Sequence, residues 1–204
     1  MTEAQPYPYR FHIALDGSGL NGLEGRAGVC IFLFNPQDNS YAYSINYFDG
    51  AGGGHALAVN PGGTLGYLGN TGQHLLLYDA RTGLELSRQS TLAFEPVNTS
   101  LQGSTHAVWL SDDEFVTVIG EHFYRFHAGD LSQAEKLGRH GVKLPHGIKL
   151  TRGGTHLAYG SMDNPALGEH GEARTVGLFE LATGEVTLIE LPATCWHVAT
   201  HPTQ

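Results

Sequence analysis

Four histidines recur at matching places along the chain, each at the start of a short apolar run. They are His55, His106, His146 and His197, and successive members are 51, 40 and 51 residues apart. Neutral imidazole binds zinc, copper, iron and nickel, with its nitrogen about 2.0 to 2.1 Å from an ion such as zinc. If the fold gathers the four positions, the sequence predicts a mononuclear metal centre with four imidazole ligands.

The histidines belong to a repeat of about 40 to 50 residues, the length of a four-stranded propeller blade. Runs rich in Val, Ile, Leu, Tyr and Phe alternate with clusters of Gly, Asn, Asp and Pro, and few windows have a helical period. Repeats start at HALAVNPGG (55–63), HAVWLSDDE (106–114) and HGIKLTRGG (146–154). We predict an all-β fold, a four-bladed β-propeller forming one domain over residues 1–204, in which the first strand of each blade lines the axis.

The two ends of the chain complete this pattern. Residues 11–49 align with 155–191, so the first blade lacks its innermost strand, and WHVATHP (196–202) has the pattern of that strand. We expect strand closure between the two termini, which removes the open edge of the sheet stack. Two alternatives remain: the chain is a piece of a larger propeller, or it is half of a dimer that exchanges this strand.

The same position in each repeat places four imidazoles in a ring around the axis. The alternative is that each repeat carries a histidine that bonds the backbone of a neighbouring blade. The other histidines share no register, although His201 follows His197 by four residues and could serve a second site lower in the channel.

Further candidates lie on the face where the axial strands begin. Asp16 and Glu121 end strands there, and we expect catalytic roles for both, with the Glu121 carboxylate accepting the second N–H of a ligand imidazole. The alternative for Glu121 is an exposed acidic residue in a turn. Two long loops, 18–26 and 162–174, would overhang the metal. The residues expected to line the substrate pocket are Leu20, Met162, Cys195 and Trp196.

The repeats HALAVNPGGTLGYLGNTGQHLLLYDARTGLEL and HGIKLTRGGTHLAYG resemble bacterial propellers with WD-like and lactonase-like repeats. A four-histidine axial site is similar to that of the carotenoid cleavage oxygenases, which hold iron, and of the selenium-binding protein and methanethiol oxidase family. The resemblance implies metal ligation by the four histidines and a supporting role for Glu121. Those families are seven-bladed and far longer, so the resemblance concerns the architecture of the site and identifies no substrate.

Charge and composition disfavour some classes of binding partner. Eleven Lys and Arg against twenty Asp and Glu give a net charge of −9, which disfavours nucleic acid. No apolar stretch has the length of a membrane helix and the first residues lack a signal-peptide pattern, so we expect a cytoplasmic protein that does not enter a membrane. The two cysteines form neither a disulfide framework nor a CxxC pair.

These features favour a metal-dependent oxidoreductase, of oxygenase or oxidase type, acting on a small and largely apolar molecule. Fe(II) is the favoured ion, Cu and Zn are alternatives, and dioxygen is the candidate co-substrate. One alternative is a zinc or manganese lyase or isomerase, and another is a non-catalytic propeller that binds a partner. The sequence contains no GxSxG motif for nucleophilic hydrolysis and no phosphate-binding loop.

Overall fold

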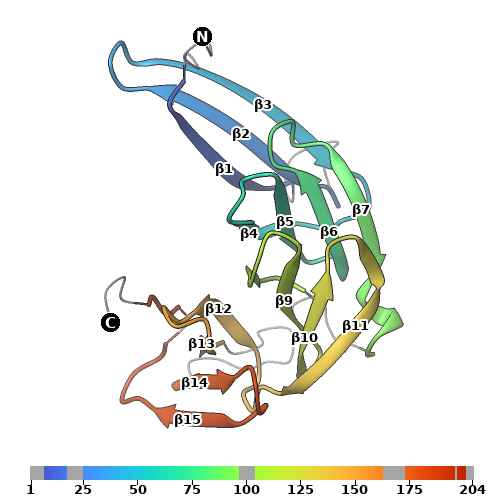
Figure 1. Ribbon diagram of the computed structural model, residues 1–204, viewed down its shortest axis with the longest axis vertical. Helices are drawn as coiled ribbons and strands as arrows, with labels where there is room; N and C mark the ends of the chain where they lie inside the picture. The colour runs from blue at the N-terminus through green and yellow to red at the C-terminus, as the bar shows by residue number, and fades with distance from the viewer. Residues whose placement is uncertain (1–6, 18–24, 97–103, 163–172, 196, 201–204) are drawn as a thin grey trace.

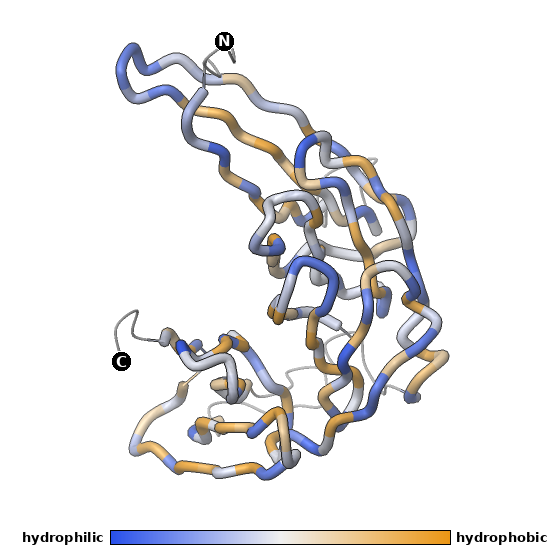
Figure 2. The backbone as a smooth tube through the Cα atoms, in the orientation of Figure 1, coloured by the Kyte–Doolittle hydropathy of each residue, from blue (hydrophilic) through white to orange (hydrophobic). Residues whose placement is uncertain are grey.

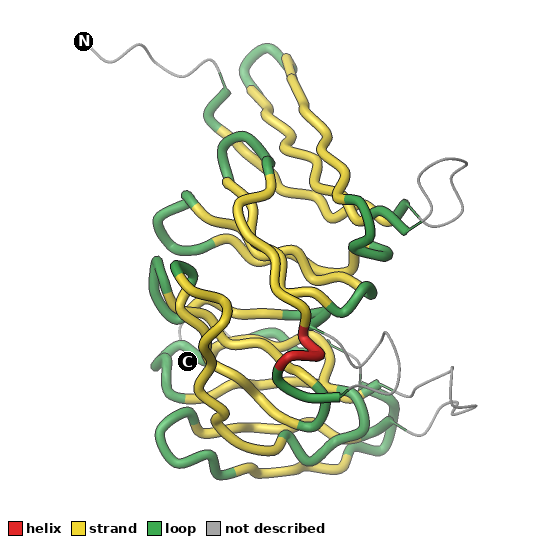
Figure 3. Tube along the Cα trace, turned by 90° about the vertical axis from the view of Figure 1, so that its right-hand side faces the viewer, coloured by secondary structure: helices red, strands yellow, loops and turns green. Residues whose placement is uncertain are grey.

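The computed structural model of the chain describes residues 7–17, 25–96, 104–162, 173–195 and 197–200. Within them the structure is almost entirely β, with one short 3₁₀ turn at Thr91–Ala93 (Figure 3). None of the helical structure described is long and apolar enough to span a bilayer. The strands are β1 (Tyr9–Asp16), β2 (Ala27–Asn35), β3 (Ser40–Phe48), β4 (Gly54–Val59), β5 (Leu65–Asn70), β6 (His74–Asp79), β7 (Glu85–Ser90), β8 (Ala107–Trp109), β9 (Glu114–Ile119), β10 (His122–His127), β11 (Asp130–Arg139), β12 (Pro145–Leu150), β13 (His156–Ser161), β14 (Thr175–Glu180) and β15 (Val186–Glu190).

The strands form four antiparallel sheets, each a run of neighbours in the sequence. The orders are β1-β2-β3, β4-β5-β6-β7, β8-β9-β10-β11 and β12-β13-β14-β15. Figure 1 shows the sheets following one another around an open arc, with β1, β4 and β12 on its concave side and β3, β7, β11 and β15 on its convex side. The predicted all-β propeller with four blades is therefore confirmed.

Strands that are buried on both faces carry continuous apolar runs. Here the apolar side chains of successive sheets fill the space between those sheets. Val29 and Ile31 of the first sheet pack with Leu68 and Leu76 of the second. The second and third sheets share a core that includes Tyr67, Leu75, Phe115 and Phe126. The third and fourth share one that includes Val116, Phe123, Tyr159 and Phe179. Each sheet is thus fixed against its neighbour along the arc, which positions the strand ends on the concave side.

The expected closure between the termini is not formed in the part of the chain described. The first sheet has three strands, and residues 197–200 belong to no strand. The physical reason is that the chain entering this segment stays on its own sheet: the Cys195 N–H donates to the Ala173 carbonyl, and the Cys195 carbonyl accepts from the Ser161 N–H. The sheet β12–β15 lies across the opening of the arc from β1–β3 (Figure 1).

Candidate metal centre

Three of the four repeat histidines meet at the inner ends of three consecutive sheets. His55 lies in β4, His106 directly precedes β8, and His146 lies in β12. Their ligand nitrogens all lie within 4.8 Å of one another. The ring centroids are 4.9 Å apart for His55 and His106, 5.2 Å for His55 and His146, and 4.4 Å for His106 and His146. The repeat register therefore brought these imidazoles together as predicted.

Glycines allow the sheets to approach closely where the histidines begin. A Cβ on Gly54 would overlap with the carbonyl of Leu15 in β1, and a Cβ on Gly69 would overlap with the carbonyl of Thr105. These contacts place β1 against the residue before His55, and β5 against the residue before His106. A side chain at either glycine would push the sheets apart, so the glycines help to set the spacing of the imidazoles.

The Nε2 atoms of His55 and His146 are 3.0 Å apart. Two nitrogens that each lie about 2.0 to 2.1 Å from one ion are separated by about 2.8 to 3.4 Å at angles between square and tetrahedral. This distance fits two ligands of a single ion, and it equally fits a hydrogen bond between the two rings. Thr105 contributes the next contact, because its hydroxyl lies 3.1 Å from Nδ1 of His106. When Nδ1 donates to that hydroxyl, the Nε2 lone pair of His106 is left for coordination.

Burial lowers the pKa of two of the three histidines. His106 and His146 are 9% and 7% exposed, whereas His55 is exposed. Desolvation, followed by repulsion from His146, His55, His197 and Lys149, lowers the pKa of His106 to about 2. Burial and the charge of His197 lower the pKa of His55, opposed by the negative charge of Asp16. Neutral imidazole is the form that binds metal, so the lowered pKa values of His106 and His55 favour metal binding at neutral pH.

His197 lies beside the cluster. Its ring centroid is 4.5 Å from that of His146 and 6.5 Å from that of His106, and the residue is exposed. It reaches this position by a segment that follows β15, rather than from a fourth axial strand. His55, His106 and His146 form the compact group, and the His197 ring lies next to it, beside His146.

The two predicted carboxylates lie in different surroundings. The Asp16 carboxylate is close to Gly53 and acts electrostatically on His55. The Glu121 carboxylate is 66% exposed and pairs with Arg139 at 3.1 Å. Of the two, Asp16 is the one whose charge reaches the histidine cluster. Asp16 lies at the end of β1, next to the start of β4, and this position distinguishes it from Glu121 as the carboxylate near the cluster.

Two of the predicted pocket residues fall within the described part of the chain. Met162 is partly buried, and its N–H donates to the Leu144 carbonyl. Cys195 is partly buried, and its Sγ lies 3.6 Å from the His197 carbonyl oxygen. The second contact holds the Cys195 thiol next to the His197 backbone. Leu20, Trp196 and His201 lie outside the described residues.

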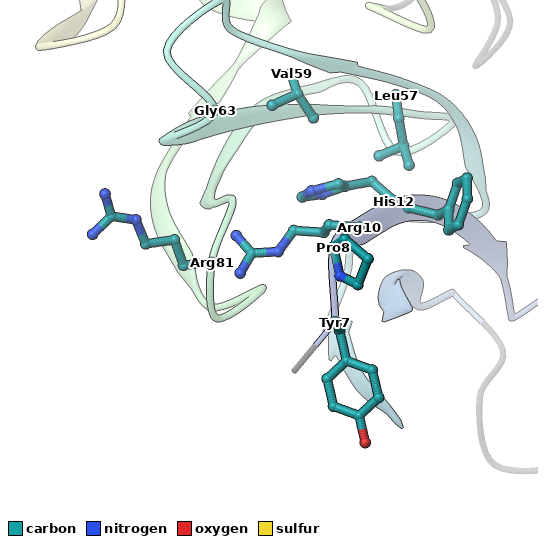
Figure 4. Close-up of a pocket in the computed structure, with 9 residues that line it drawn as sticks. Tyr7, Pro8, Arg10, His12, Leu57, Val59, Gly63 and Arg81 are labelled. Atoms are coloured by element: carbon teal, nitrogen blue, oxygen red, sulfur yellow. The ribbon is translucent and has the colours of Figure 1, made fainter. Parts of the chain in front are cut away.

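A cleft that the sequence did not indicate opens between β1 and β4. It has a volume of about 870 Å³. Figure 4 shows Arg10 and His12 from β1 facing Leu57 and Val59 from β4, with Arg81 at one end. Nδ1 of His12 lies 3.1 Å from the Tyr78 hydroxyl. No pattern marked these residues, because they come from a strand edge and a turn that meet only in the folded chain.

No family model and no curated protein matches the sequence. Among solved structures, the chain is similar to one titled "Dihydro-heme d1 dehydrogenase NirN in complex with DHE", with a TM-score of 0.57 and 14% sequence identity. The match covers 83% of this chain and 35% of that chain, so this chain corresponds to about a third of the length of that protein. At this identity the likeness shows the fold, a β-propeller, and the histidine cluster is compatible with metal binding on that fold.

Stability should fall as the pH is lowered from about 7 to 5. Burial lowers the pKa of five histidines, namely His12, His55, His74, His106 and His140. A base whose pKa is lower in the folded state binds fewer protons there than in the unfolded chain. Acid therefore favours unfolding once the pH drops below the unfolded value of about 6.5. The aspartates with lowered pKa values, such as Asp79, act only near and below pH 4.

Urea unfolding followed by tryptophan fluorescence, with EDTA present to exclude metal, measures this effect. The midpoint should decrease between pH 7.5 and 5.5. His140→Gln should reduce the pH dependence, because the buried His140 side chain donates from Nε2 to the Gly120 carbonyl and accepts at Nδ1 from the Val142 N–H. An unchanged midpoint over this range would contradict the assigned protonation states.

Proposed function

We propose that the chain holds one redox-active transition-metal ion on His55, His106 and His146, with His197 as the fourth ligand, and uses it as an oxidoreductase on a small, largely apolar molecule. The observation that carries this proposal is the convergence of three imidazole nitrogens within 4.8 Å from three separate sheets. A hydrogen bond between His55 and His146 accounts for two of the rings, but it does not account for the third nitrogen, from His106, so three convergent imidazoles favour a shared ion.

The donor set bears on the choice of ion. Three or four neutral nitrogen ligands leave the full positive charge on the metal, and imidazole suits iron, copper and zinc alike. We favour Fe(II), with Cu as the next candidate. Such an ion would supply one-electron chemistry and a position for dioxygen or substrate. A zinc or manganese ion would instead support the lyase or isomerase reaction, by polarising a carbonyl.

This chain's own residues would position and tune that ion. The Thr105 hydroxyl orients the His106 ring through Nδ1. Asp16 offers a negative charge next to His55, which partly balances the charge of a bound cation. The buried side of the cluster, formed by His106 and His146, excludes water, while the exposed side at His55 and His197 gives access.

The proposed redox role predicts an open coordination position on a metal that changes oxidation state. Metal-free protein loaded with Fe(II) under nitrogen should bind nitric oxide and give an electron paramagnetic resonance signal, which His106→Ala should lose. Dioxygen should oxidise the Fe(II) form, and ascorbate should restore it, over repeated cycles. A protein that takes up zinc but gives no nitric oxide signal with Fe(II) would contradict the redox role and leave the zinc alternative.

A further inference from the structure

The first sheet has one face that nothing in the described chain covers, and that face is apolar. Three rows of side chains cross β1, β2 and β3 on it. The rows are Tyr9–Phe34–Tyr41, Phe11–Phe32–Tyr43 and Ile13–Cys30–Ile45. The outer members of these rows are between 44% and 63% exposed. Contiguous apolar surface of this kind marks an interaction site.

The rings on this face already form a packed surface. The ring centroids of Phe11 and Phe32 are 6.3 Å apart, those of Phe32 and Tyr41 are 5.7 Å apart, and Tyr9 stacks on Phe11 at 6.5 Å. The opposite face of the same sheet, through Val29 and Ile31, packs on the second sheet. Elsewhere along the arc, sheets meet face to face in the same way. The chain itself therefore shows what covers such a face: another sheet of this kind.

The far end of the arc carries a second uncovered face, on which apolar side chains alternate with the exposed Lys149 and Thr187. In the last sheet, Leu157, Tyr159 and Phe179 point toward the third sheet. The alternate positions point away from it, and pairing places Ala158 beside Leu178 and Val176 beside Ile189. Ile189 is 45% exposed. Figure 2 shows hydrophobic residues along strands of both end sheets, on either side of the opening of the arc.

The edge of the first sheet is also open. Among the described residues β1 pairs with β2 alone, so its other edge has no hydrogen-bonded strand beside it. Residues 197–200 match the sequence pattern of a strand for this edge, yet they form no strand in the single chain. Because β1 lies across the opening of the arc from the last sheet, the segment is better placed to reach a second molecule (Figure 1).

We propose that a second copy of this chain closes the ring. The last sheet of each copy packs on the first sheet of the other, and residues 198–200 of each copy, which follow His197, pair with β1 of its partner. One twofold axis relates the two copies, so that both end faces are covered and both open edges are paired. The assembly is therefore closed and does not grow into a filament. The proposal does not depend on the metal site.

The surface available is sufficient for a stable dimer. Aromatic side chains bury about 150 to 250 Å² each, so the half-exposed side chains of the first-sheet face can bury roughly 500 Å². With the opposing face included and the contact repeated by symmetry, the total is about 2,000 Å², which is the size of stable protein interfaces. The first-sheet rows contain no charged side chain, which favours their burial against Ala158, Val176, Leu178 and Ile189 of the last sheet, while the Lys149 ammonium keeps to the rim.

Sedimentation equilibrium or light scattering on the untagged chain tests the dimer. At micromolar concentration the mass should be twice the 22.0 kDa of one chain. Phe11→Glu with Tyr43→Glu should give a folded monomer, because each copy would bury charges against an apolar face. The matched control is Leu84→Glu with Leu86→Glu, at residues that are 57% and 54% exposed on the β6–β7 connection and β7, and it should remain a dimer.

Cysteine cross-linking tests the arrangement. An oxidised mixture of Tyr43→Cys protein and Ile189→Cys protein should form a mixed disulfide-linked pair, whereas wild type, with Cys30 and Cys195 alone, should not. A wild-type monomer would overturn the proposal. So would a dimer that persists in the Phe11/Tyr43 variant, or Tyr43→Cys protein that links to itself, since that would join two first sheets.

Discussion

His106→Ala should weaken transition-metal binding by at least about 100-fold, since even the loss of a group that only orients a ligand costs about 10 to 100-fold. The His106 ring is buried, and its centroid lies 4.4 Å from that of His146 and 4.9 Å from that of His55. Its removal leaves two imidazoles of the compact group, which cannot by themselves hold an ion tightly. Competition against a chromophoric chelator measures the affinity.

Two further variants make this result specific. His74→Ala removes a half-buried histidine at the start of β6, outside the cluster, and should leave the metal affinity unchanged. His197→Ala should have a smaller effect than His106→Ala, because the His197 ring is exposed and lies 6.5 Å from that of His106. Equal affinities for wild type, His106→Ala and His74→Ala would show that the cluster does not bind the ion.

Gly177→Ala should destabilise the fold by about 3 kcal/mol, in the upper part of the range for overpacked cores. Gly177 pairs with Tyr159 across β13 and β14, and a Cβ there would overlap with the Tyr159 ring. Tyr159 cannot move aside, because it is fully buried and its hydroxyl donates to the His140 carbonyl at 2.6 Å. For a chain of this size, the loss corresponds to a decrease in Tm of roughly 6 to 12 °C.

Calorimetry or thermal circular dichroism checks this value. Gly153→Ala is the matched control, because a Cβ there would meet only the Thr155 side chain, at 3.7 Å, and its Tm should change little. Gly66 repeats the arrangement, since it pairs with Tyr78 and a Cβ on it would overlap with that ring. A Tm for Gly177→Ala equal to that of Gly153→Ala would contradict the packing described between β13 and β14.

The sheet architecture was predictable because strand and turn signals repeat at a fixed spacing. HALAVNPGG and HGIKLTRGG each contain an axial strand and the turn after it, and the structure has β4 and β12 there. The closure was not predictable in the same way. The sequence of residues 196–202 matches a strand, but pairing depends on whether β1 lies within reach, and the curvature of the arc decides that. Curvature arises from how whole sheets pack and leaves no local signal.

The candidate site was likewise predictable only in part from the sequence. A shared register was enough to bring His55, His106 and His146 together, because equivalent positions in stacked sheets meet at the inner edge. The supporting contacts were not deducible. The Thr105 side chain orients His106, and Gly69, which has no side chain, leaves room for the Thr105 backbone. The charge near His55 comes from Asp16, while Glu121 pairs with Arg139. These partners are set by side-chain directions, which the repeat does not specify.

The most direct test of the account is the metal content of the protein purified without an affinity tag or chelator, measured by inductively coupled plasma mass spectrometry against protein concentration. We expect about one iron or copper per chain in wild type, and a large loss in a variant with His55, His106 and His146 all replaced by Ala. A chain that holds no metal even after reconstitution with Fe(II), Cu and Zn, or that binds metal equally well in the triple variant, would contradict the proposed metal centre.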